Sequence, residues 1–83
     1  MPIHVKLLYF GQTRDASGKS EEEFSLADGS SLRSLLNQAS ERHEKLDRLR
    51  KSIKVALNEE MARGDEKLND GDVIALLPPV AGG

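Results

Sequence analysis

The chain has 83 residues and a formal net charge of -2, and 31% of its residues are charged. A chain of this length forms one domain with a modest core, so a large catalytic cleft is not expected. Without a basic excess, nucleic acid is a poor candidate as a partner. No apolar stretch approaches the ~20 residues that cross a bilayer, so we expect a cytoplasmic protein.

Few side chains in the chain carry reactive chemistry. It has no cysteine, which excludes disulfides, thiolate metal ligands and a thiol nucleophile. Its two histidines, His4 and His43, are far apart in the sequence and lack the spacing of a metal site. We therefore expect this chain to bind neither a metal nor a cofactor of its own.

The first predicted elements are two strands joined by a loop. Alternate residues of 3–10 form one wholly apolar face, which we expect to meet the core. The other face becomes apolar at Leu8 and Phe10, which a sheet buried on one side does not require. Residues 11–20 predict a mobile loop, and residues 21–26 predict an edge strand whose glutamates discourage unwanted pairing. The inward residues are Ile3, Val5, Leu7, Tyr9, Phe24 and Leu26.

A helix is predicted after the Asp28-Gly29 turn. Ser31 is a preferred N-cap residue. After it, apolar residues recur at i, i+3, i+4 and i+7, the pattern of one buried stripe on a helix. A weaker periodicity reaches Leu49 and predicts a break or a second short helix. The stripe consists of Leu32, Leu35, Leu36 and Ala39.

The last third of the chain predicts two strands and a short segment between them. Residues 53–57 alternate as a third strand, and Met61 lies in the short segment after it. The turn at residues 70–72 precedes a buried strand over residues 73–77. The order of elements predicts an α+β fold in which one main helix covers one face of a mixed sheet of four to five strands.

The final six residues are the predicted functional site. The two prolines cannot donate to a sheet ladder, and the first keeps Leu77 extended. We expect residues 1–77 to form the domain and residues 78–83 an extended tail that reaches roughly 20 Å. The last two glycines lack side chains, so their backbone can approach a partner's groove closely. The tail consists of Pro78, Pro79, Val80, Ala81, Gly82 and Gly83.

Four segments together match the pattern of a known family. They are Leu8-Tyr9-Phe10-Gly11-Gln12, Val55-Ala56-Leu57-Asn58-Glu59, Leu68-Asn69-Asp70-Gly71-Asp72 and the end from Leu77 to Gly83. The chain in these segments resembles the small subunits of molybdopterin synthase. Those proteins are sulfur carriers with a β-grasp, ubiquitin-like fold, so the resemblance implies that fold here.

The resemblance also implies a chemistry for Gly83. An adenylating partner would use ATP and Mg²⁺ to convert its carboxylate to an acyl adenylate, and a sulfur donor protein would displace AMP to leave a thiocarboxylate. That group would attack a pterin precursor in the large subunit, where the catalytic pocket is expected. Two carriers in turn would supply the two dithiolene sulfurs, and the family's complex is a heterotetramer of two small and two large subunits.

An interface at the root of the tail is a further expectation. Phe10, Met61 and Leu77 stand where members of that family contact the large subunit and the activating enzyme. Alternation places Leu8 and Ala75 on the same face, away from the helix, and an exposed apolar patch marks an interaction surface. The alternative is that a loop or terminus of the same chain covers Leu8 and Phe10.

Three other functions remain open. A sulfur carrier for thiazole synthesis has the same broad shape, although such chains are usually shorter and lack the two prolines. A protein modifier would be activated in the same way and would end in an isopeptide bond between Gly83 and a lysine. A β-grasp interaction module with an inert tail would be unaffected by deletion of Gly82 and Gly83.

Overall fold

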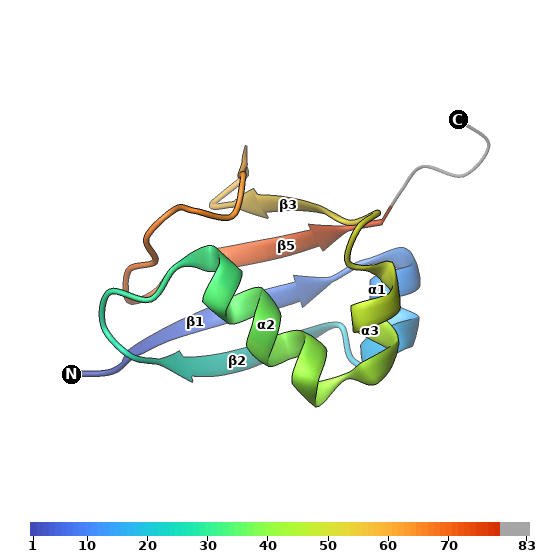
Figure 1. Ribbon diagram of the computed structural model, residues 1–83, viewed down its shortest axis with the longest axis horizontal. Coiled ribbons are helices and arrows are strands. Elements are labelled where there is room, and N and C mark those ends of the chain that lie inside the picture. Colours follow the sequence, from blue (N-terminus) through green and yellow to red (C-terminus); the bar gives the residue numbers. More distant parts are fainter. Residues whose placement is uncertain (79–83) are drawn as a thin grey trace.

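The computed structural model describes residues 1–78. They form a five-stranded sheet with helices against one face (Figure 1). Within these residues, no helix is both long and apolar enough to cross a membrane. The elements are β1 (Ile3–Tyr9), α1 (Gly11–Ser17), β2 (Glu21–Leu26), α2 (Leu32–Arg42), α3 (Glu44–Leu49), β3 (Lys54–Leu57), β4 (Glu60–Met61) and β5 (Val73–Leu77).

The sheet is mixed, with the strand order β2-β1-β5-β3-β4. β1 and β2 form an antiparallel hairpin, whereas β5 runs parallel to β1 in the centre of the sheet. β3 is antiparallel to both β5 and β4. This order, with α2 across one face, confirms the predicted β-grasp fold.

The predicted apolar stripe of the helix is part of the core, on the side of α2 that faces the sheet. The Ser31 hydroxyl accepts a hydrogen bond from the Ser34 N–H at 3.2 Å, which caps the helix start as predicted. Leu32 and Leu35 have no exposed surface. α3 is the predicted second short helix, and it buries Leu46 against the same core.

One apolar cluster holds the sheet and the helices together. Its residues come from the inward faces of β1, β2 and β5, from α2 and α3, and from the segment that carries Leu68. The cluster consists of Ile3, Val5, Leu7, Tyr9, Phe24, Leu26, Leu32, Leu35, Ala39, Leu46, Leu68, Ile74 and Leu76.

Truncation of Leu35 tests the importance of this cluster. Because Leu35 is fully buried, Leu35→Ala leaves a cavity, and we expect it to lower the free energy of unfolding by about 2–5 kcal/mol. Urea titration followed by circular dichroism measures the change. Asn37→Ala, on the exposed side of the same helix, should shift stability by less than about 0.5 kcal/mol, and equal losses in the two variants would contradict the assignment.

The prediction of a mobile loop over residues 11–20 is wrong, because residues Gly11–Ser17 form α1. Thr13 is fully buried. Its hydroxyl accepts the Phe10 N–H at 2.8 Å and donates to the Phe10 carbonyl at 2.6 Å, so it fixes the first turn. Ala16 packs against the core, and Gly18, with a φ of 75°, ends the helix in the left-handed conformation.

A tight turn joins β3 to β4 and is tied to the start of β5. Asn58 and Glu59 both have positive φ, at 50° and 73°, as the two central residues of a hairpin turn matched to strand twist require. The Asn58 side chain accepts the Val73 N–H at 2.9 Å and donates to Asp72 at 3.0 Å. The turn and the start of β5 therefore hold each other in place.

Candidate functional site

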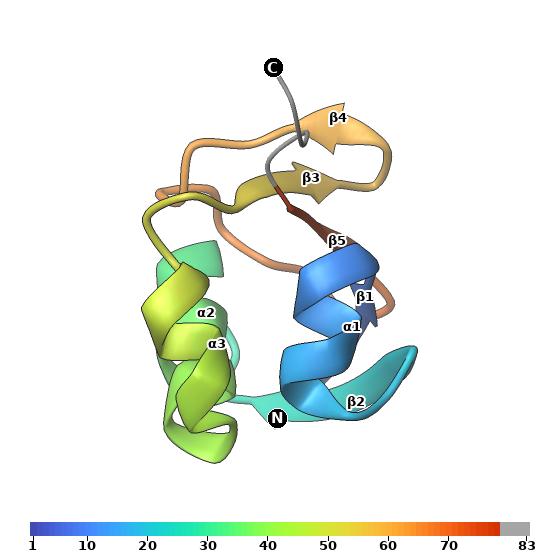
Figure 2. The ribbon, with the colours of Figure 1, turned by 90° about the vertical axis from the view of Figure 1, so that its right-hand side faces the viewer.

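The sheet face opposite α2 carries an apolar row across four strands. Leu8 on β1 is paired with Ala75 on β5, and Ala75 is paired with Ala56 on β3. Ala56 is in turn paired with Met61 on β4. Directly paired residues point to the same face of a sheet. Figure 2, seen roughly along the strands, shows α2 and α3 gathered on the other side.

The end of this face lies beside the root of the tail. Phe10 and Leu77 each follow the paired residues Tyr9 and Leu76 by one position, so they extend the apolar row toward the point where the chain leaves the sheet. Phe10 is 47% exposed and Met61 is 62% exposed. The structure thus brings all five predicted interface residues to one face. We call this surface the tail-root patch: Leu8, Phe10, Ala56, Met61, Ala75 and Leu77.

Two further residues of this face were not predicted from the sequence. Ala56 completes the row, and the 36% exposed Val73 precedes Ala75 by two positions on β5. The signal for both was the period of two, which places them opposite the inward residues of their strands. Both were overlooked because alanine is small and because Val73 was assigned to a strand buried as a whole.

Two hollows lie on opposite sides of the sheet. One, of about 300 Å³, is lined by Leu8, Asn58, Glu59, Val73 and Ala75, and it adjoins the tail-root patch. The other, of about 480 Å³, lies between α2, α3 and β3, on the face that bears the helices. Leu8 and Ala75 of the patch line the first hollow, and Met61 of the patch lines the second.

The tail itself is described only at its first residue. Pro78 is half-buried, and its ring lies against Gly11 at the start of α1, where an added Cβ would be 2.8 Å from the proline Cγ. The remaining predicted tail residues, Pro79, Val80, Ala81, Gly82 and Gly83, lie outside the described residues. Their assignment as the working end of the chain therefore stays a prediction.

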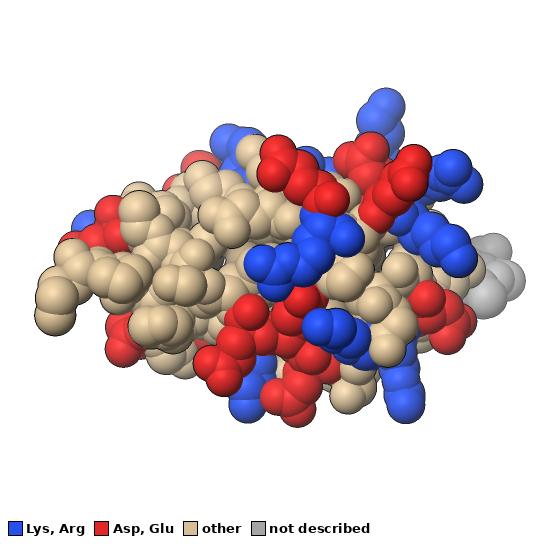
Figure 3. Space-filling model, turned by 90° about the horizontal axis from the view of Figure 1, so that it is seen from below, with Lys and Arg blue, Asp and Glu red and all other residues tan. Residues whose placement is uncertain are grey.

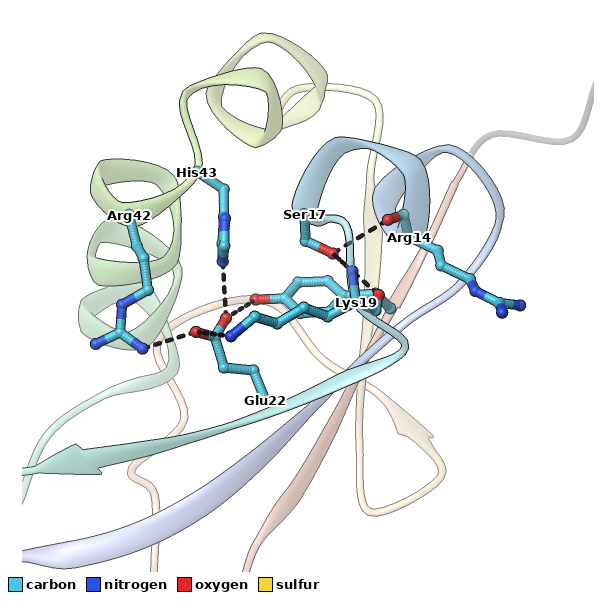
Figure 4. Close-up of polar contacts among 7 residues, drawn as sticks. Arg14, Ser17, Lys19, Glu22, Arg42 and His43 are labelled. Atoms are coloured by element: carbon cyan, nitrogen blue, oxygen red, sulfur yellow. Dashed lines mark hydrogen bonds and ion pairs between the residues drawn. The ribbon is translucent and has the colours of Figure 1, made fainter.

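A second cluster, which the sequence analysis missed, surrounds Glu22 on β2 (Figure 4). Glu22 is only 8% exposed and points toward α2 and α3. Its Oε1 accepts the Tyr9 hydroxyl at 2.8 Å and the His43 Nε2 at 2.8 Å. Its Oε2 accepts Arg42 Nη1 at 2.8 Å and Lys19 Nζ at 3.4 Å.

Burial and hydrogen bonding act on the Glu22 carboxylate in opposite directions. Burial by itself would raise the pKa of Glu22, but the hydrogen bonds from Arg42, His43 and Tyr9 outweigh it and lower that pKa to about 2. Burial and the hydrogen bond to Glu22 raise the pKa of the Tyr9 hydroxyl. Glu22 therefore stays ionised and cannot serve as a proton donor near neutral pH. The cluster joins β2 to α2 and α3 and has a structural role.

The described residues offer no other concentrated chemistry. Among residues 1–78, no group of three His, Cys, Asp or Glu side chains is placed to hold a metal ion. Side chains of both charges are intermixed on the face seen from below in Figure 1 (Figure 3). The tail-root patch is therefore the main candidate surface for function.

Comparisons with known proteins identify the family to which the sequence is similar. Residues 7–83 match the sequence model of the ThiS family. A relative from Chlamydomonas reinhardtii, named "Molybdopterin synthase sulfur carrier subunit", is 40% identical over 83 residues that cover 98% of this chain and 100% of the relative.

Solved structures give the same result. A Pyrococcus furiosus protein described as molybdopterin converting factor, subunit 1, superposes with a TM-score of 0.86 at 34% identity, covering 94% of this chain and 99% of its own. A chain in the complex of subunits 1 and 2 of the Helicobacter pylori molybdopterin-converting factor superposes with a TM-score of 0.68 at 30% identity, covering 98% and 100%. A fold of this kind is therefore found in complex with a second subunit.

Proposed function

This chain belongs to the ThiS family, and from that premise we propose that it is the sulfur carrier subunit of a molybdopterin synthase. The observation that carries the proposal is the 40% identity to a relative of that name, and the match to the family model extends to Gly83 itself. The relative from Chlamydomonas reinhardtii bears the corresponding name and is matched over its whole length.

In this proposal the reacting group is the carboxylate of Gly83. A free carboxylate is a poor electrophile, so an adenylating enzyme with ATP and Mg²⁺ first forms an acyl adenylate and releases pyrophosphate. A sulfur donor protein then displaces AMP and leaves a thiocarboxylate on Gly83. The chain has no cysteine on which sulfur could travel, which supports the terminus as the carrier.

Partners supply the rest of the chemistry. The thiocarboxylate attacks a pterin precursor held by the large subunit, which provides the acid, base and electrostatic groups. Water then cleaves the acyl–sulfur bond, which leaves the sulfur on the pterin and returns Gly83 to a carboxylate. The tail-root patch docks the domain while the tail enters the partner's site, in the cytoplasm where ATP is available. The Helicobacter pylori complex of subunits 1 and 2 supports a partner of this kind.

Intact-mass measurement tests this proposal directly. The chain is incubated with its activating enzyme, ATP and a sulfur source, and we expect one oxygen to be exchanged for sulfur within the C-terminal peptide. The matched reaction without ATP should leave the mass unchanged. If the complete reaction also leaves the mass unchanged, the proposal is wrong, and a ladder of conjugates through Gly83 would identify a protein modifier instead.

Introduction of a charge into the patch tests the docking surface. Phe10→Arg places an unpaired charge in the proposed interface, so we expect the Kd for the large subunit to rise at least about tenfold, or about 1.4 kcal/mol. Since Phe10 is 47% exposed, the stability of the domain should change by less than about 1 kcal/mol. Calorimetric titration measures the affinity. Gln38 is exposed on α2, so Gln38→Arg adds the same charge away from the patch. An equal rise in Kd for this variant would contradict the assignment of the patch as the docking surface.

A further inference from the structure

The end of β1 and the end of β5 bring two distant parts of the chain together. β1 and β5 are parallel neighbours, and their last paired residues are Tyr9 and Leu76. The chain beyond β1 turns into α1 at Gly11, while the chain beyond β5 continues into Pro78. Both continuations leave the sheet at the same edge, which places Gly11 against Pro78.

Two features of position 11 favour glycine over residues with a side chain. Its φ is +52°, in the left-handed region that favours glycine. A Cβ there would also lie 2.8 Å from Cγ of Pro78, inside van der Waals contact. A proline Cγ belongs to a closed ring and cannot rotate away as the end of a flexible side chain would. The overlap could be relieved by a change in the pucker of the proline ring or by movement of the backbone at Gly11 or at Pro78.

A buried hydroxyl holds the Gly11 side of this contact in place. Thr13 is fully buried and bonds both the N–H and the carbonyl of Phe10. The same hydroxyl oxygen lies 3.4 Å from the carbonyl oxygen of Leu76. The start of α1 is thus braced against the end of β5, two residues before Pro78.

We propose that Gly11 is a positioning residue for the tail. By leaving space for the Pro78 ring, it sets where the chain departs from the domain and so aims Gly83 at the partner's reacting centre. This inference rests on the proposed function, because it needs Gly83 to be the sulfur-bearing residue. In this inference the start of α1, which otherwise has no role in the reaction, positions the first residue of the tail.

Gly11→Ala and Gly18→Ala form a matched pair for testing this inference. Gly11 begins α1 and Gly18 ends it, both with left-handed φ, at +52° and +75°, but a Cβ at Gly18 would meet nothing within 4 Å. Thiocarboxylates of wild type and both variants can be made by sulfide cleavage of intein fusions, which avoids the activating enzyme. At saturating large subunit, we expect the single-turnover rate of sulfur transfer to fall about 10- to 100-fold for Gly11→Ala. For Gly18→Ala it should stay within about twofold of wild type.

Removal of the overlapped atom should restore the rate. Pro78→Ala deletes Cγ, so Gly11→Ala/Pro78→Ala should match Pro78→Ala alone, whereas a purely structural role of Gly11 would leave the double variant impaired. If Gly11→Ala proves unfolded by its amide spectrum, the same second substitution should restore folding. Independently, wild type should show a nuclear Overhauser contact between Gly11 and the Pro78 ring.

The outcomes separate this inference from the proposed function. Equal rates for Gly11→Ala and Gly18→Ala, no recovery in the double variant, or no contact between Gly11 and Pro78 in wild type would overturn the positioning role. A wild-type thiocarboxylate that transfers no sulfur would contradict the function itself. A wild-type chain that transfers sulfur, beside a Gly11→Ala variant that does so equally well, would remove the positioning role alone.

Discussion

Removal of Gly82 and Gly83 should reduce sulfur transfer to background. Two extended residues span about 7 Å, so the new terminal carboxylate would fall short of the reacting centre by that distance, and it would carry the side chain of Ala81. The chain has no cysteine that could take over the sulfur. Product formation with large subunit, activating enzyme and sulfur source measures the loss.

Docking should survive this truncation. The tail-root patch is unchanged, so the shortened chain should still compete with wild type for the large subunit. The matched control removes Met1 and Pro2, which are exposed at the other terminus, and should transfer sulfur at the wild-type rate. Product formed by the C-terminal truncation at the wild-type rate would favour the module with an inert tail.

Replacement of Glu22 by alanine should destabilise the domain by about 2–4 kcal/mol. The change leaves the Tyr9 hydroxyl buried without its partner, and it leaves Arg42 without its carboxylate while Arg42 still lies 4.5 Å over the Phe24 ring. Arg42 and Lys19 are each about half exposed and can turn to water, so the buried hydroxyl accounts for much of the loss. Denaturation in urea measures it.

The neighbouring glutamate provides the control. Glu23 follows Glu22 on β2 but is exposed, so Glu23→Ala removes the same atoms from the other face. We expect it to change the free energy of unfolding by less than about 0.5 kcal/mol. Similar losses at the two positions would show that the Glu22 cluster adds little beyond strand propensity.

The same carboxylate predicts how stability depends on pH. The pKa of Glu22 is about 2 in the folded chain and 4.5 ordinarily, so below pH 4.5 the unfolded state binds a proton that the folded state does not. The contribution of Glu22 is complete above about pH 4.5 and is lost as the pH falls toward 2. Wild type should therefore lose stability over this range more steeply than Glu22→Gln, and parallel curves would contradict the lowered pKa.

The regular elements were predictable because each has a clear period. The alternation in residues 3–10 and the recurrence of Leu32, Leu35 and Ala39 follow from the geometry of strands and helices, and the structure has both. α1 was not predictable in this way. Its composition is typical of a loop, and its helix depends on the burial of Thr13 and Ala16, which requires the rest of the fold.

The sites divide in the same manner. Alternation predicted that Leu8, Phe10, Ala75 and Leu77 share one face, whereas Met61 was predicted from the family resemblance alone. The Glu22 cluster was not predicted, although Glu22 lies two residues before the buried Phe24 and therefore on the same face of β2. A carboxylate on an edge strand also protects against unwanted pairing, so its type alone does not predict a buried cluster. Its partners Arg42 and His43 are 20 and 21 residues away, so no local pattern connects them.

The central place of β5 affects how the molecule forms during synthesis. β5 lies between β1 and β3, yet it follows both in the sequence. A nascent polypeptide therefore cannot close the sheet until residues 73–77 have left the ribosome, and such long-range pairing is slow. Since Ala75 and Leu77 belong to β5, an unfinished chain also lacks the surface for docking.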